Sequence, residues 1–404
     1  NIMFEVYKKE LKELLRDKKT LMFVVLLPVL IFPVIFAIVA FIGTQAALDA
    51  DQKVNTYVII NGEYAQEFTD KVFYHKSFEL YKGSKTFNTI EELKAGVTAG
   101  DIDMGIYLPS NAVKTLDNGE QSKWQVVFND AKSINFLFDR VKELAQEYSD
   151  VLQAEKLKSF GIEESAHKSI LNPIEVVKVD TADKRENLGE KIGAYLPYLL
   201  IPLVLMGATY PAIDLGAGEK ERGTLETLLL TPITRTELVL GKFITLLTTS
   251  IASTTITVVS MGCWVAVALA FADLDFIKTA FSTLAVTDLL MIFVLLLPLA
   301  AIFSSLALAI SIYARTFKEA QNYMAPLSMG VFFPIIISIM PNMELTAKTA
   351  FIPVTNVALA IKDIIKGTVD YTFVGLIFLA TVLIAGALLA FCVKWFNRED
   401  VLFR

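Results

Sequence analysis

Few residues in this sequence have the types and spacing that catalysis or phosphate binding requires. The run Gly83–Thr86 ends like a phosphate-binding loop, but Phe78 stands where the loop needs a glycine five positions earlier. The serines and histidines form no G-x-S-x-G nucleophile motif, and His75 and His167 lack the spacing of zinc ligands. The sequence therefore predicts that this chain is not an enzyme, and that any ATP it depends on is bound by another chain.

Polar side chains inside apolar runs are a second group of candidates. An acidic residue costs about 2.5–3.5 kcal/mol at the centre of a membrane helix, which marks Asp214 and Asp288 as possible contacts of a transported solute. Both lie near the ends of their runs, where water can reach them. Thr249 and Ser253 belong to a series of hydroxyl residues that could line a polar path or coordinate a cation. The same hydroxyls can instead bond their own helix carbonyls or allow close helix packing.

The third candidate is a short charged segment, residues 217–232, between two apolar runs. Leu225, Leu228 and Leu229 are spaced i, i+3 and i+4, so they share one face of a predicted amphipathic helix that Pro232 ends. Such a helix could meet a partner protein through its carboxylates, or lie on the membrane surface without a partner. The residues of interest are Glu219, Glu221, Arg222, Gly223, Thr224, Leu225, Glu226, Leu228 and Leu229.

The composition indicates what kind of scaffold must position these residues. Of the 404 residues, 54% are hydrophobic, and the mean hydropathy is +0.52. These values are typical of a membrane protein rather than a soluble one. The net charge is -6 and the basic residues are scattered, so nucleic-acid binding is not expected.

Six apolar runs are long enough to cross a bilayer. They cover residues 21–43, 193–215, 238–271, 283–313, 323–340 and 372–395. Pro28 and Pro33 are expected to kink the first of them. Residues 1–20 predict a basic amphipathic helix in the headgroup layer, with an apolar face that includes Phe4, Leu14 and Leu15. The alternative is that these residues are only a charged segment next to the first span that sets its topology.

Residues 44–191 are polar and mixed in charge, and they lack the long apolar runs of the rest of the chain. Short alternating runs predict strands at 56–60, 103–109, 124–128 and 174–179, and longer periodic runs predict helices up to residue 72, at 89–99 and at 133–160. The sequence therefore predicts a compact α/β domain between the first and second spans. The expected fold class is a six-helix transmembrane domain with an N-terminal interfacial helix and this large extracytoplasmic domain, with residues 192–404 forming the other five spans.

The distribution of basic residues predicts the orientation. The N-terminal flank, the Lys220–Lys242 loop, the Arg315–Lys318 loop and the C-terminal tail fall on one side, which should be cytoplasmic with both termini. Residues 44–191, the Asp273–Asp275 loop and residues 341–371 then lie outside. The last segment is apolar, broken by proline and too short for a span, which favours a re-entrant or interfacial segment. A packed lid beneath the external domain is the alternative.

The sequence resembles the type-2 ABC exporter permeases over essentially its whole length. Glu219–Leu229, followed by Thr231-Pro232 and Leu240-Gly241-Lys242, is similar to the cytoplasmic signature of that family. Ala99–Pro109 resembles a segment of its external domain. The order of interfacial helix, first span, external domain and five further spans resembles the family as well.

This resemblance implies the permease subunit of an ATP-driven exporter in the bacterial cytoplasmic membrane. In the family, the loop that matches Glu219–Leu229 forms a coupling helix that docks on an ABC ATPase subunit. The expected partners are two ATPase copies, a second permease copy that is identical or related, and the lipid bilayer. ATP and Mg are expected in the ATPase, with no cofactor and no metal in this chain.

The cargo follows less directly from the same resemblance. Within the family, the likeness points to the sodium-efflux permeases of the NatB kind, so sodium is the expected cargo. A hydrophobic drug, a lipid or a peptide is the alternative cargo. A different class of function is a membrane-anchored sensor or assembly module whose external domain binds a partner.

Overall fold

The chain forms two compact units, which a computed structural model describes over residues 2–52, 54–113, 119–129, 137–271, 278 and 281–398. The first unit, called the helical unit, comprises Asn1–Ala37 and Asp180–Arg404. The second, called the α/β unit, comprises Ile38–Val179. The predicted Asp273–Asp275 loop lies outside the described residues.

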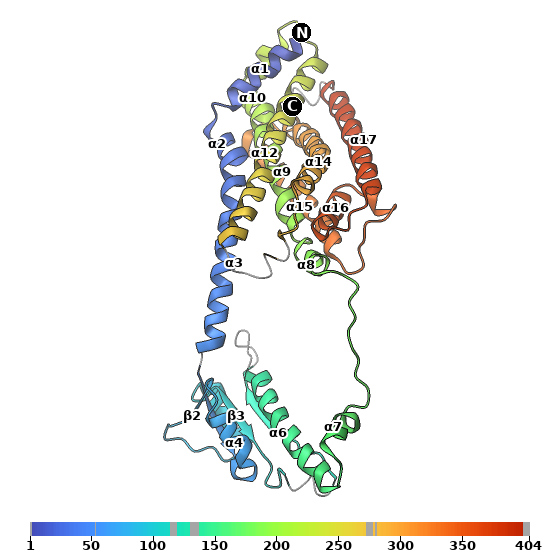
Figure 1. Cartoon of the computed structure of the whole chain (residues 1–404). Coiled ribbons are helices and arrows are strands. Elements are labelled where there is room, and N and C mark those ends of the chain that lie inside the picture. Colours follow the sequence, from blue (N-terminus) through green and yellow to red (C-terminus); the bar gives the residue numbers. More distant parts are fainter. Residues whose placement is uncertain are drawn as a thin grey trace. The chain divides into compact units, whose positions relative to one another are not determined.

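Six helical stretches in the described part of the chain are long and apolar enough to cross a membrane, which confirms the six predicted spans. Five of them are built on α9 (Leu196–Ile213), α12 (Arg235–Phe271), α14 (Val286–Tyr313), α15 (Phe317–Ile339) and α17 (Tyr371–Phe396). Helix α14 packs against the other four, as Figure 1 shows. Its buried stripe of leucine, isoleucine and phenylalanine side chains forms the centre of the larger hydrophobic core.

The chain from its N-terminus to the end of the first span forms four helical pieces, of which the last three make up the span. They are α1 (Ile2–Leu14), α2 (Lys18–Leu21), the π-helix η1 (Met22–Leu26) and α3 (Leu27–Gln52). Pro28 has no N–H to donate and its ring crowds the carbonyl four residues earlier, which lies within η1. A kink near Pro28 therefore takes the form of a π-helical turn.

The expectation of one helix over residues 1–20 is corrected in its extent. Helix α1 ends at Leu14. Asp17 then caps α2 by accepting hydrogen bonds from the N–H groups of Lys19 (3.1 Å) and Thr20 (3.3 Å). The buried stripe of α1 is Val6, Glu10 and Leu14, because α1 packs on α12. Phe4 is 50% exposed and Leu15 is 61% exposed, which is compatible with side chains that face lipid, so the interfacial position of α1 stays a prediction.

The segment predicted as one helix over residues 217–232 also consists of separate pieces. Helix α9 continues through the π-helix η4 (Asp214–Gly218) into α10 (Glu219–Glu221), and α11 (Thr224–Leu229) follows. Between α10 and α11 lies Gly223, whose φ of +71° is a conformation that residues with a side chain rarely adopt. This glycine allows the chain to turn away from the axis of α9.

The segment at 341–371 contains η5 (Thr349–Phe351) and α16 (Thr355–Lys366). Helix α16 has 12 residues, about 18 Å of helix, which is too short to cross a hydrocarbon core of about 30 Å. It is nearly all buried against α9, α14, α15 and α8 (Lys184–Ile192). Its depth in a membrane stays a prediction.

The α/β unit is a four-stranded sheet covered by helices on both faces. Its strands are β1 (Asn55–Ile60), β2 (Phe78–Leu80), β3 (Met104–Tyr107) and β4 (Gln125–Phe128), in the order β2-β1-β3-β4. Strand β1 is parallel to β2 and β3, with Tyr57 opposite Met104, and β4 is antiparallel to β3. Its helices are η2 (Gly62–Ala65), α4 (Gln66–Phe73), α5 (Ile90–Ala99), α6 (Leu137–Ser159) and α7 (Glu164–Leu171).

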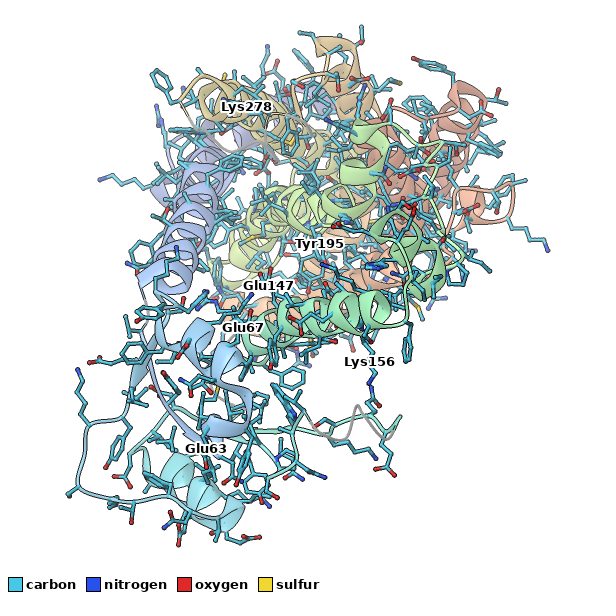
Figure 2. All side chains as sticks on the ribbon, turned by 60° about the horizontal axis from the view of Figure 1, so that its bottom comes forward. Glu63, Glu67, Glu147, Lys156, Tyr195 and Lys278 are labelled. Atoms are coloured by element: carbon cyan, nitrogen blue, oxygen red, sulfur yellow. The ribbon has the colours of Figure 1, made fainter. Side chains whose placement is uncertain are left out.

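Alternating side chains of the strands supply both cores of this unit. Tyr57, Met104 and Ile106 face α4 and α6, while Ile60 packs with Leu93 of α5 on the other face. Figure 2 shows Glu67 of α4 and Glu147 of α6 among the side chains of these helices, which pack against each other. The Nζ of Lys71 on α4 lies 3.1 Å from the carboxylate of Glu147.

Two expectations for this region are wrong. Residues 174–179 are not a strand, since they pair with no sheet in the described structure, and Ile174 and Val176 are 80% and 89% exposed. The compact unit ends at Val179 rather than at residue 191, because α8 packs on α16 of the helical unit. The strands expected at 56–60, 103–109 and 124–128 are confirmed, and β2, only three residues long, was not expected.

Candidate functional site

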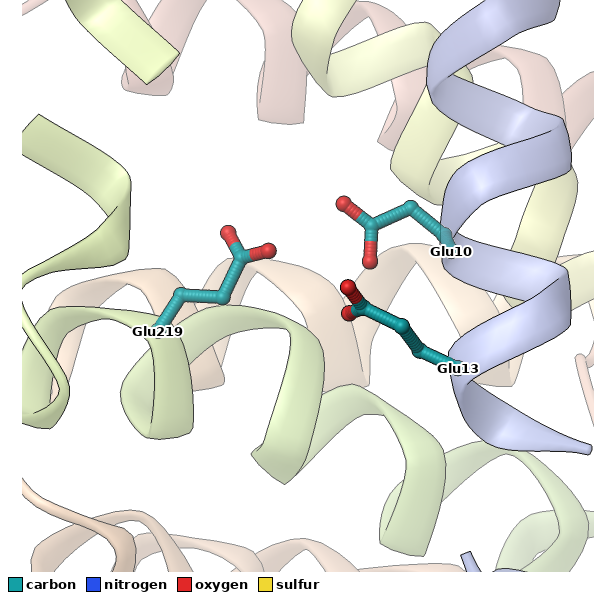
Figure 3. A group of neighbouring side chains, drawn as sticks. All are labelled: Glu10, Glu13 and Glu219. Carbon is teal, nitrogen blue, oxygen red and sulfur yellow. The ribbon is translucent and has the colours of Figure 1, made fainter. Parts of the chain in front are cut away.

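Charged side chains from three segments meet where α1 packs beside α10 and α12. We call Lys9, Glu10, Glu13, Glu219 and Lys242 the junction cluster. The first three come from two adjacent turns of α1, Glu219 begins α10, and Lys242 lies in the second turn of α12. Figure 3 shows the three carboxyl groups of the cluster, which point toward one another from α1 and α10. The cluster ties the charged segment after α9 to the N-terminal helix.

Lys242 is almost completely buried, as are Glu10 and Glu219. Its side chain is 1% exposed, and its Nζ donates to Glu10 Oε1 at 3.2 Å, to the carbonyl of Leu215 at 2.8 Å and to the carboxylate of Glu219. An ammonium group has three N–H donors, so each has an acceptor. A buried lysine without such partners would be strongly unfavourable.

The side chain of Lys9 lies on the solvent-facing side of the cluster, close to all three carboxylates. Its Nζ is 3.4 Å from Glu219, 3.6 Å from Glu10 and 3.8 Å from Glu13, and its side chain is 40% exposed. Burial lowers the pKa of Lys9, but the attraction of Glu10, Glu219 and Glu13 outweighs it, so the net pKa is raised. Lys9 is therefore firmly cationic at neutral pH.

Glu10 differs from an ordinary surface carboxylate. Its side chain is fully buried, and its Oε2 has no hydrogen-bond partner among the residues that the structure describes. Burial raises the pKa of Glu10, and the repulsion of Glu219 adds to this, against the attraction of Lys242 and Lys9. One oxygen of a buried carboxyl group therefore faces the cluster without a donor.

The leucine face of the charged segment is not on the surface. Leu225 is 5% exposed, and Leu228 and Leu229 are partly buried against the same hydrophobic cluster, so this face packs on the chain itself rather than on a membrane surface. The outward side chains are instead Glu226, Thr227 and Leu230, of which Leu230 is 88% exposed. Burial also withdraws Glu219 from any direct contact with a partner.

The other expected residues of the segment have partners in the chain itself. Glu221 accepts a hydrogen bond from the N–H of Phe317 at 2.8 Å. The Thr224 hydroxyl donates to the carbonyl of Glu219 at 3.3 Å, and Arg222 donates to Asp214 at 2.9 Å. These contacts hold the segment against α15 and η4. Their role in coupling stays a prediction.

Three of the four expected pathway residues, Asp214, Asp288 and Thr249, have structural partners, whereas the buried Oγ of Ser253 has no hydrogen-bond partner among the described residues. The structure does not bring the four residues together at one site. Asp214 pairs with Arg222, while Asp288 accepts from the N–H of Ala285 at 2.9 Å and lies 3.3 Å from a guanidinium nitrogen of Arg185. The hydroxyl of Thr249 donates to the carbonyl of Leu246, three residues earlier on α12. These contacts favour capping and ion pairing for the two aspartates.

Most hydroxyls of α12 bond their own helix. The donors to the carbonyl four residues earlier are Thr245, Thr248, Thr254, Thr255 and Thr257. Ser253 is fully buried beside Gly207, where an added Cβ would lie 2.6 Å from the serine Cβ. The series therefore supports close helix packing.

A pocket of about 630 Å³ lies at another part of the helical unit, between α8, α16 and residues 339–345. Glu190 of α8 lies 2.7 Å from Lys362 and 2.6 Å from Lys366, so these two lysines of the pocket share one carboxylate. Asp363 also lines the pocket, and burial raises its pKa to about 6. Sequence patterns alone did not single out these residues.

Sequence reasoning also missed three members of the junction cluster, namely Lys9, Glu10 and Glu13. Lys242 entered the sequence analysis as part of a motif and of a basic loop, without a role in an ion pair. The available signal was that Glu10 has the spacing i, i+4 with both Val6 and Leu14, which places it within an apolar stripe. A charged residue in such a stripe indicates a buried partner.

Comparison with known proteins agrees with this architecture. The family model described as ABC-2 family transporter protein matches residues 18–393. The chain is also similar to the "ABC transporter permease protein NatB" of Bacillus subtilis (strain 168), with 27% identity over 387 residues that cover 91% of each chain. With six span-capable helices and a family match over nearly its whole length, the chain belongs to the ABC-2 family of transporter proteins and is an ABC transporter permease subunit.

Proposed function

We propose that this permease is driven by a separate ATPase that docks at the exposed side of α11. The observation that carries the proposal is the division of α11 into two sides. Leu225, Leu228 and Leu229 anchor it to the helical unit, while Glu226, Thr227 and Leu230 face outward. A short helix that is fixed on one side and exposed on the other suits the transfer of motion between subunits.

The connections of this segment provide a route for that motion. Helix α10 is joined to α1 and α12 through the junction cluster, and to the start of α15 through Glu221. A displacement of α11 by a partner would therefore act on several spans together. Rigid-body movements of packed helices are a common way for ligand binding to cause a large change.

A docking test uses a substitution that leaves the anchored side intact. Leu230→Asp places a charge on the most exposed apolar side chain of the outward side, directly after the end of α11, and we expect it to abolish co-purification with the ATPase subunit. Val286→Asp is the matched control, because Val286 is 74% exposed and begins α14, where a negative charge is favourable. Normal ATPase binding by Leu230→Asp would refute the docking proposal.

Sodium is the cargo that we propose, and the direction is export. This rests on the likeness to the sodium-efflux permeases of the NatB kind, which is supported by 27% identity to the Bacillus subtilis permease protein NatB. Permease and ATPase reconstituted together in vesicles should show ATP hydrolysis that rises with sodium, and ATP-dependent sodium movement. If sodium has neither effect while a drug, lipid or peptide stimulates hydrolysis, the cargo is wrong and the exporter proposal survives.

We also infer that the complex contains two permease chains, identical or related, and two ATPase subunits that hold ATP and Mg. One chain supplies six candidate spans, and a pathway between two such bundles needs a second copy. Native mass spectrometry of the purified complex measures the stoichiometry directly. A stable assembly with a single permease chain would contradict this inference.

Orientation is the remaining part of the proposal. We propose that both termini and α11 face the cytoplasm of a bacterial cell and that the α/β unit lies outside. In a Cys263→Ser background, a membrane-impermeant maleimide should label Glu91→Cys in intact cells and Thr227→Cys only after lysis. Both positions are exposed, so labelling reports the side of the membrane. The reverse pattern would overturn the orientation.

A further inference from the structure

The carboxyl groups of Glu10, Glu13 and Glu219 converge on one position in the junction cluster. We propose that they form a binding site for a divalent cation, which competes with the ammonium group of Lys9 for that position. The site would lie in the joint between α1 and the segment that leads to α11. It is independent of what the permease transports.

Convergence of the ligand atoms is the first argument. One carboxylate oxygen from each of the three residues lies within 4.8 Å of the others, and they come from α1 and α10. Figure 3 shows these carboxyl groups directed toward a shared space. Hard divalent cations such as Ca²⁺, Mn²⁺ and Mg²⁺ take oxygen ligands, and carboxylates are the charged ones among them.

The unpartnered oxygen of Glu10 is a second, independent observation. Glu10 is fully buried, and its Oε1 is engaged by Lys242, whereas its Oε2 has no hydrogen-bond partner in the described structure. A buried polar atom without a partner costs free energy, so a ligand that satisfies it is favoured. A cation held by Glu13 and Glu219 would supply that partner.

The position of Lys9 marks the neighbourhood in which such a cation would lie, although the Glu10 oxygen 3.6 Å from its Nζ is Oε1 and not the unpartnered Oε2. Its Nζ is 3.4–3.8 Å from oxygens of all three carboxylates, distances longer than most N–H···O hydrogen bonds. Lys9 thus fills a cation position without tight hydrogen bonds. Because its side chain is 40% exposed and Glu13 is 51% exposed, the lysine can move into solvent and an ion can reach the carboxylates.

Charge balance favours a divalent ion over a monovalent one in this exchange. When all three carboxylates are ionised they face two ammonium groups, so the cluster with both lysines in place then carries one unbalanced negative charge. When a divalent ion replaces Lys9, its two charges and that of Lys242 balance the three carboxylates. The free-energy cost of burying charged groups is lowest when opposite charges compensate them fully.

Binding of Mn²⁺ to the purified full-length permease in nanodiscs tests the proposal. Titration calorimetry and the decrease of the free Mn²⁺ electron paramagnetic resonance signal both report the Kd without any transport assay. Lys9→Ala removes the competing ammonium and should tighten binding by about tenfold, whereas Glu13→Gln removes a ligand and should weaken it by about tenfold or more. Both changes lie on the partly exposed side of the cluster, which limits their effect on folding.

Lys8→Ala is the matched control. Lys8 is the neighbour of Lys9 on α1, but it pairs with Glu5 outside the cluster, so its removal should leave the Kd unchanged. An unfolding midpoint measured for each variant without Mn²⁺ establishes that the fold is intact. If Lys9→Ala binds Mn²⁺ no more tightly than Lys8→Ala, or if Glu13→Gln binds like the unsubstituted chain, the proposal is wrong. A proton on Glu10 then balances the charge instead.

Discussion

Lys242 illustrates how a single side chain can hold two distant segments of this permease together. It lies on α12, and both Glu10 and Glu219 depend on it for a counter-charge. A buried ion pair gains little over an apolar pair of the same size, because both charges lose their hydration. Removing one member is different, since it leaves the other charges buried and unpaired.

Lys242→Met should therefore destabilise the permease strongly. Loss of one partner of a buried ion pair costs about 3–5 kcal/mol, and we expect the free energy of unfolding in detergent to fall by about that amount. Lys8→Met is the comparison, since an exposed pair contributes about 1 kcal/mol or less. Similar losses in the two variants would show that the cluster does not stabilise the joint.

Asp363 should make stability depend on pH in a defined direction. Burial raises its pKa from 3.8 to about 6; Lys366 and Lys362 oppose the rise, and Glu190 and Glu344 add to it. Between these two values the folded protein keeps a proton that the unfolded chain has released. The contribution of Asp363 to stability is therefore present at low pH and lost as pH rises through this window.

Asp363→Asn removes this titration. The free energy of unfolding of the variant, relative to that of the unsubstituted protein, should therefore increase as pH rises from about 4 to about 7. Unfolding midpoints of both proteins across this range measure the effect. Glu190, whose pKa is lowered by its hydrogen bonds to Lys362 and Lys366 against the effect of burial, changes stability in the opposite direction. Because Glu190 is present in both proteins, the difference between them reports Asp363. Parallel profiles would contradict the assignment.

Among the elements, η4 matters because it connects a span to the proposed docking helix. It packs closely on α14, where the N–H of Ala217 donates to the hydroxyl of Ser311 at 3.0 Å. Gly216 makes this approach possible, since an added Cβ would lie 2.3 Å from Ser311 Oγ and 2.9 Å from its backbone carbon. A shift of η4 relative to α14 would be passed on to α10 and α11.

Gly216→Ala should thus force the two elements apart. Overpacking of a close contact costs about 1–3 kcal/mol, and we expect lower stability together with weaker stimulation of the ATPase. Gly375→Ala, on α17, is the matched control, because nothing lies within 4 Å of its added Cβ. That substitution should be neutral or stabilising by up to about 1 kcal/mol. If the two variants behave alike, the close contact at η4 has no energetic role.

For the whole molecule, the division into two units has consequences for folding. The α/β unit contains two hydrophobic clusters of its own, one on each face of the sheet, and every member of these clusters lies within the unit. A domain with a separate core can in principle fold alone. The exposed residues 174–179 that follow it have the character of a linker.

A fragment of residues 54–171 should consequently be soluble and unfold cooperatively, as measured by circular dichroism during heating. Phe68 is fully buried between the sheet and α6, so Phe68→Ala should destabilise the fragment by about 3–5 kcal/mol. Tyr74→Ala is the control, because Tyr74 is 82% exposed. A fragment without a cooperative transition would show that the unit depends on the helical unit.

Local patterns in the sequence determined the elements of this protein. The six candidate spans follow from runs of uncharged apolar residues, and α5 follows from its period together with the Thr89 cap, whose hydroxyl accepts from the N–H of Glu92. These features depend on residues a few positions apart. Hydrophobicity and capping act over that range, so the sequence alone is sufficient to predict them.

Tertiary structure decided which side of each element is buried and what it meets. The partner of Glu10 is Lys242, 232 residues away, and no local pattern connects them. The leucine face of α11 packs on its own chain, and residues 174–179 have a strand pattern but no strand to pair with in the described structure. Burial of a charge or pairing of a strand requires a partner brought close by folding, and only the three-dimensional arrangement supplies that partner.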